Sequence, residues 1–75
     1  MSRSAAHHGT ARLSAMDQRD LDGLARLRGV DGTARVLGVE VTAIDPLVWG
    51  GVATQRRVDT VTRALAAWRA KGSAA

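Results

Sequence analysis

The stretch that decides the fold runs from residue 29 to residue 51 and reads GVDGTARVLGVEVTAIDPLVWGG. It predicts a short helix, a glycine-containing turn and a second short helix. Ala34 is small enough for the following helix to pack closely, and Gly38 can leave the first helix in the left-handed conformation without a steric penalty. The apolar side chains expected to cover the shared core are Val39, Ile44 and Leu47. This arrangement is typical of a helix-turn-helix unit.

The residues TARVLGV at 33–39, VTAID at 41–45 and the closing pair Gly50 and Gly51 resemble the phage-repressor type of helix-turn-helix, the Cro/repressor family. The resemblance implies an all-α, four-helix helix-turn-helix domain. It also implies a small transcriptional regulator that binds duplex DNA as a homodimer on a two-fold site. Proteins of this type are encoded by phages, plasmids and other mobile elements.

A helix is predicted from about residue 15 to residue 28, with Ser14 as its N-cap. Its apolar residues recur at helical spacing. They are Leu21, Leu24, Ala25 and Leu27, with Leu13 or Met16 as further candidates. Gly23 costs about 1 kcal/mol relative to alanine inside a helix, which suggests that another helix packs closely there. Asp22 falls on another face and is expected to point to solvent.

Two further helices flank the central turn region. Asp31 is the predicted N-cap of a helix over residues 32–37, and Thr54 that of the longest helix, over residues 55–70, which Gly72 ends. One face of the longest helix is apolar and is expected to be core or a dimer contact. This stripe comprises Val58, Val61, Leu65 and Trp68.

Pro46 interrupts the remaining helix, which is expected from Val41 to Trp49 with Glu40 as its cap. Proline lacks a backbone N–H and disfavours helical angles at the residue before it. We favour a helix that is kinked at Pro46. The alternative is a turn over residues 41–44 that leads into a short helix over residues 46–49.

The N-terminal segment, residues 1–12, has no periodicity and is expected to be a flexible, disordered tail before a helix-turn-helix domain at residues 13–72. His7 and His8 in this segment have no carboxylate or thiol near them in the sequence, so we expect no metal and no other cofactor. The sequence has neither a start like a secretory signal nor an apolar run long enough for a bilayer. We therefore expect a cytoplasmic protein with no membrane partner.

The chain has 75 residues and no cysteine, so it forms one domain with a small core and no disulfide to stabilise it. Association with a second copy would add stability. The formal net charge of +4 favours an anionic partner. Residues 50–75 carry five cations against Asp59 alone, whereas residues 38–49 carry Glu40 and Asp45 and no cation. A basic surface is therefore expected outside the recognition helix.

If the resemblance extends to DNA binding, the outward face of the third helix enters the major groove. The base-facing residues would be Val41, Thr42 and Asp45, with Trp49 at the border of the groove. The phosphate-contacting residues would be Arg35, Arg56 and Arg57. A face with a carboxylate, a proline and an indole departs from the basic and amide residues that the family typically carries there.

This departure leads to a second hypothesis, a helix-turn-helix fold used as a protein-binding module or inhibitor encoded by a mobile element. Its partner surface would comprise Glu40, Asp45, Pro46 and Trp49. Exposed tryptophan is a favoured anchor of protein interfaces. The sequence contains no constellation for acid–base, nucleophilic or metal chemistry, so we do not expect an enzyme.

Overall fold

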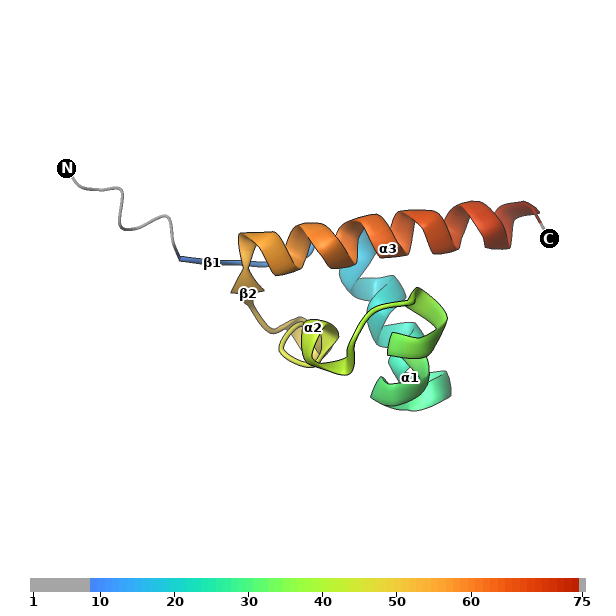
Figure 1. The fold of residues 1–75 in the computed structure, drawn as a ribbon, viewed down its shortest axis with the longest axis horizontal. Coiled ribbons are helices and arrows are strands. Elements are labelled where there is room, and N and C mark those ends of the chain that lie inside the picture. Colours follow the sequence, from blue (N-terminus) through green and yellow to red (C-terminus); the bar gives the residue numbers. More distant parts are fainter. Residues whose placement is uncertain (1–8, 75) are drawn as a thin grey trace.

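Three α-helices, one 3-10 helix and a two-stranded sheet make up residues 9–74, which are the residues that the computed structural model describes (Figure 1). The elements are, in order, β1 (Thr10–Ala11), α1 (Ala15–Leu37), α2 (Val41–Ile44), η2 (Val48–Gly50), β2 (Ala53–Thr54) and α3 (Gln55–Ala74). The prediction of a mostly helical chain is confirmed. The described residues form three α-helices where four were predicted, because two predicted helices are joined and a third is much shorter.

α1 bends at Gly29 and so joins the two helices predicted on either side of this residue. Gly29 has φ 76° and ψ 169°, a backbone conformation that is essentially restricted to glycine. The helix resumes directly after it, so Asp31 lies inside the first turn and its prediction as an N-cap is wrong. Instead, the Thr33 hydroxyl donates a hydrogen bond to the Gly29 carbonyl at 2.8 Å.

The two ends of α1 match the prediction. The Ser14 hydroxyl accepts a hydrogen bond from the Asp17 backbone N–H at 3.2 Å, which makes it the N-cap. Gly38 ends the helix with φ 71° and ψ 31°, in the left-handed conformation. Its N–H and that of Val39 donate to carbonyls of the last turn of α1, which satisfies groups that the end of a helix leaves free.

The single kinked helix predicted from Val41 to Trp49 is wrong. α2 ends at Ile44, a turn follows, and the next helical segment is η2, of 3-10 type. Pro46 has no N–H with which to continue the helical hydrogen bonds. The arrangement is closer to the alternative of a turn followed by a short helix, although the second segment starts only at Val48. Within it, Trp49 has a φ of 64°, which is left-handed and unusual for a residue with a side chain.

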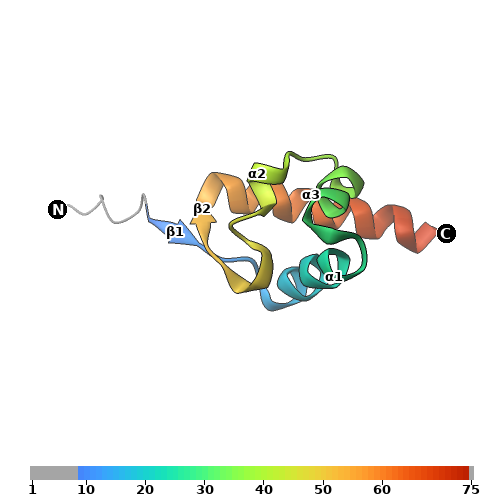
Figure 2. The ribbon, with the colours of Figure 1, turned by 90° about the horizontal axis from the view of Figure 1, so that it is seen from below.

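The small sheet was not predicted. β1 pairs antiparallel with β2, so that Thr10 lies opposite Thr54 and Ala11 opposite Ala53 (Figure 2). Thr10 and Ala11, which we predicted to lie in a flexible tail, are therefore attached to the segment before α3. Residues 1–8 of the predicted tail, with His7 and His8, lie outside the described residues.

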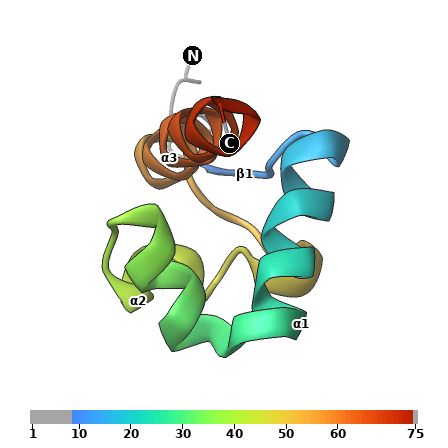
Figure 3. The same cartoon turned by 90° about the vertical axis from the view of Figure 1, so that its right-hand side faces the viewer.

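One apolar cluster joins all the helices, and α1 and α2 both extend below α3 in Figure 3. Its fully buried members include Leu21, Ile44, Leu47, Val61 and Leu65. The predicted stripe on α3 therefore packs inside the chain: Val58 is also buried, and Trp68 is half-buried at the edge of the cluster. Thr54 caps α3 as predicted, because its hydroxyl accepts the Arg57 backbone N–H at 3.3 Å.

Two predictions about α1 and one about α3 are wrong. Leu27 is 84% exposed, because steps of three residues drift by about 60° each and carry it about 120° away from buried Leu21. No helix packs closely on Gly23, where an added Cβ would meet no atom within 4 Å. α3 does not end at Gly72 but continues to Ala74, so glycine here is tolerated within the helix.

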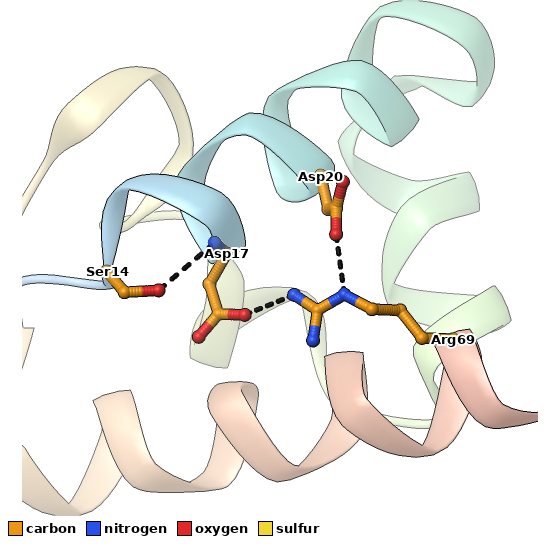
Figure 4. Close-up of polar contacts among 4 residues, drawn as sticks. All are labelled: Ser14, Asp17, Asp20 and Arg69. Carbon is orange, nitrogen blue, oxygen red and sulfur yellow. Dashed lines mark hydrogen bonds and ion pairs between the residues drawn. The ribbon is translucent and has the colours of Figure 1, made fainter.

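Arg69 fastens the C-terminal half of α3 to the first turns of α1 (Figure 4). Its Nε donates to Asp20 at 2.7 Å, and its guanidinium forms a second ion pair with Asp17. The Asp17 side chain is largely buried, so the guanidinium compensates for water that this carboxylate has lost. The hydrogen bonds to Asp17 and then to Asp20 raise the pKa of Arg69 above its ordinary value, so the guanidinium stays charged.

Two glycine-to-alanine substitutions should have opposite effects on stability. A Cβ at Gly51 would lie 1.8 Å from the Pro46 carbonyl oxygen, so Gly51→Ala must displace the backbone and should lower the free energy of unfolding by about 1–3 kcal/mol. Gly23→Ala meets no atom and should raise it by about 1 kcal/mol through helix propensity. Urea denaturation followed by circular dichroism measures both. A stable Gly51→Ala variant would contradict this account of the loop.

Candidate nucleic-acid interface

The candidate surface begins on α2, which is a single helical turn. Ile44 on its inner side is fully buried and holds the turn on the core. On its outer side Val41 is 37% exposed, and Thr42 and Asp45 are exposed. The residues predicted to face bases therefore do point to solvent, but they occupy one turn and not a long helix.

Arg57 connects this turn to α3. Its Nη1 donates to the Thr42 carbonyl at 3.3 Å, while its own backbone N–H is held by the N-cap of α3. The side chain therefore spans from the first turn of α3 to the outer side of α2. Arg56, the preceding residue, is exposed in the same first turn of α3. The structure thus brings a predicted phosphate contact next to a predicted base-facing residue.

Carboxylates moderate the positive charge of this surface. The Glu40 carboxylate lies 3.4 Å from the Thr42 hydroxyl, which donates to it. This contact occupies the one hydroxyl donor of α2 that we predicted to meet a base. Asp45 is exposed directly after α2, and Arg35 is exposed in the last turn of α1. Arginine side chains consequently outnumber carboxylates among these residues, but the excess is small.

Trp49 does not belong to the α2 face on which we had placed it. Its backbone N–H donates to the Asp22 carboxylate at 2.8 Å, and the same carboxylate accepts the Gln18 side-chain amide at 2.9 Å. Gln18 also donates to the Leu47 carbonyl at 2.9 Å. The loop is held from its other side by Arg12, whose guanidinium donates to the Gly50 carbonyl at 3.3 Å. The indole is nevertheless 57% exposed.

Sequence reasoning missed this polar network, because it assigned Asp22 to solvent and gave Gln18 no role. The available signal was the spacing of four residues, which places the two side chains together on one helical face. Their contact with Leu47 and Trp49 had no sequence signal, since it depends on how the loop after Pro46 folds back. Pro46 itself is half-buried, so it adds less to an exposed surface than we predicted.

Asp22→Ala should loosen the Trp49 loop without unfolding the chain. The Trp49 N–H loses its acceptor and Gln18 one of its two partners, so the free energy of unfolding should fall by only about 0.5–1.5 kcal/mol. Amide hydrogen exchange at Trp49 should become faster, as NMR can show. Asp31→Ala, at an exposed carboxylate elsewhere in α1, is the control and should leave this exchange unchanged. Equal exchange in the two variants would rule out the proposed anchoring.

Within residues 9–74, no three potential metal-ligating side chains come together, and no helix has the length and apolar character to cross a membrane. Of the residues predicted as sites, Thr42 and Arg57 are in contact, whereas Trp49 is attached to α1. The chain matches no protein-family model, and no curated protein or solved structure is significantly similar to it. The function of the surface formed by α2 and the start of α3 is therefore inferred from its own residues.

Proposed function

We propose that this chain is a small DNA-binding regulator of the phage or mobile-element type, which contacts duplex DNA through α2 and the first turn of α3 and acts as a homodimer. The observation that carries the proposal is the contact between the Arg57 guanidinium and the Thr42 carbonyl. This contact makes the basic start of α3 and the exposed turn of α2 one continuous surface. The proposal includes no enzymatic activity.

In this function Arg35, Arg56 and Arg57 neutralise phosphates, and Val41, Thr42 and Asp45 approach the base edges. Phosphate contacts position a protein on the duplex, whereas base contacts confer sequence preference. With one helical turn at the bases and the Thr42 hydroxyl donating to Glu40, most of the affinity should come from the phosphates. Binding should then depend strongly on salt and only modestly on sequence.

The salt dependence of DNA binding tests this proposal. Fluorescence polarisation with a random duplex and with the DNA upstream of the coding sequence should show an affinity that falls as salt rises. Arg56→Gln and Arg57→Gln should each reduce the slope of log K against log salt by about 0.9. Arg26→Gln removes an equally exposed cation from α1, distant in sequence from the surface, and should leave the slope unchanged. A folded protein that binds neither duplex would refute the proposal.

A second candidate function is supported by Trp49. A 57% exposed indole on a loop that Asp22 and Arg12 hold in place is a rigid apolar anchor of the kind that protein interfaces use. In this function the chain is a protein-binding module or inhibitor, and Trp49 with Asp45 and Glu40 contacts a protein partner. The two functions share Asp45, but only the second depends on Trp49, so they can be separated experimentally.

Trp49→Ala separates them. The variant should keep its circular dichroism spectrum, because the indole is mostly outside the core, and it should keep the DNA affinity of wild type if the first function is right. If the second is right, affinity capture from the source cells should recover a protein with wild type and not with Trp49→Ala. Val52→Ala, a substitution at another exposed apolar residue of the same loop region, is the control and should recover it as well.

A further inference from the structure

We infer that the chain pairs with a second copy of itself through the outer face of α1, where Leu27 of each copy fills a hollow above Gly23 of the other. This inference deepens the proposed function, because it names the contact of the expected homodimer. It rests on the shape and chemistry of α1 and α3, and it is tested without DNA.

The apolar stripe of α3 is not available for this contact. Val58, Val61 and Leu65 are buried inside their own chain, and Trp68 is half-buried beside them. A dimer therefore needs apolar surface elsewhere. Among the large hydrophobic residues that the structure describes as exposed, Leu27 has the highest exposure, 84%.

Leu27 stands at the edge of a hollow between α1 and the C-terminal half of α3. The hollow has a volume of about 330 Å³ and is lined by Trp68 of α3 and by five residues of α1, which are Arg19, Asp20, Gly23, Leu24 and Leu27. Gly23 forms its open part, since a Cβ built there would meet no atom within 4 Å. A second hollow, which shares Asp20 and Trp68, continues it along the same helix boundary.

Leu27 of one copy and the hollow above Gly23 of the other can meet about a two-fold axis. Gly23 and Leu27 are four residues apart and so lie on the same face of α1. If two α1 helices pack antiparallel about a two-fold axis midway between these positions, each Leu27 lies over the Gly23 of the other copy. A two-fold interface requires such self-complementarity, because one surface patch must serve both sides.

The charge around the hollow permits this pairing. A two-fold interface brings identical charges together, so an unpaired carboxylate in the hollow would repel its counterpart in the other copy. Asp17 and Asp20 both pair with Arg69 of their own chain, and Arg19, which also lines the hollow, supplies a second positive charge. Two carboxylates are therefore balanced by two arginines, and this cluster carries no net charge. The patch is small, so we expect association in the weak range, with a Kd of about 0.1–1 mM.

Sedimentation equilibrium of the purified chain in the absence of DNA tests the inference. Wild type should shift from its monomer mass of 7.9 kDa towards twice that value as the concentration rises to about 1 mM. Leu27→Glu should remain monomeric, and its helical circular dichroism should be unchanged because the side chain is exposed. Thr60→Glu adds the same charge at an exposed site in the N-terminal half of α3 and should associate like wild type.

Gly23→Gln provides an independent variant that does not remove Leu27. Glutamine is a better helix former than glycine and has room at this site, so the melting temperature should rise while the filled hollow weakens association at least tenfold. A wild type that stays monomeric throughout, or a Leu27→Glu or Gly23→Gln variant that associates like wild type, would overturn the inference. Loss of association with retained DNA binding in these variants supports the inference and leaves the proposed DNA contacts intact. Failure of wild type to bind DNA refutes that function alone.

Discussion

The fold depends on a single apolar cluster to which every helical segment contributes buried side chains. Leu21 of α1, Ile44 of α2, and Val61 and Leu65 of α3 are fully buried in it, together with Leu47 from the turn. A chain of 75 residues has room for only one such core, and the described part has no disulfide to supplement it. The exposed surface follows from this burial: because Ile44 points inward, Thr42, two residues before it, points outward.

Side-chain hydrogen bonds then fix the segments that the core cannot hold. Arg57 links α3 to α2, Asp22 holds the loop at Trp49, and Arg69 attaches the far half of α3 to the start of α1. Each contact joins residues that are distant in sequence, and each uses a charged side chain at or near the surface. The candidate sites lie where these contacts are made, so the same residues shape the surface and supply its charge.

Local sequence signals predicted the local features of the structure. The cap at Ser14, the left-handed Gly38 and the buried stripe of α3 each depend on a few neighbouring residues, and all three are present. Features that depend on distant contacts were missed. The pairing of β1 with β2 requires two segments more than 40 residues apart in sequence, and neither has a strand-like pattern of its own.

On the candidate surface, too, the features that depend on neighbouring residues were predicted and those that depend on distant contacts were missed. That Thr42 and Asp45 are exposed follows from helical periodicity around buried Ile44. Where Trp49 lies does not follow from it, because the helix stops before Pro46 and the periodicity stops with it. Leu27 was misplaced for a related reason, since an apolar stripe with steps of three residues winds around the helix and its last member leaves the core face.

The bend at Gly29 has a consequence for how this chain could exchange parts with its copies. A residue with a Cβ cannot readily adopt φ 76° and ψ 169°, and its presence would favour one straight helix over residues 15–37. A straight helix would carry Ala34 and Leu37, both buried, away from the core of their own chain. They could then be covered only by the core of another molecule, an exchange known as domain swapping. A single glycine thus keeps the second half of α1 folded back on its own chain.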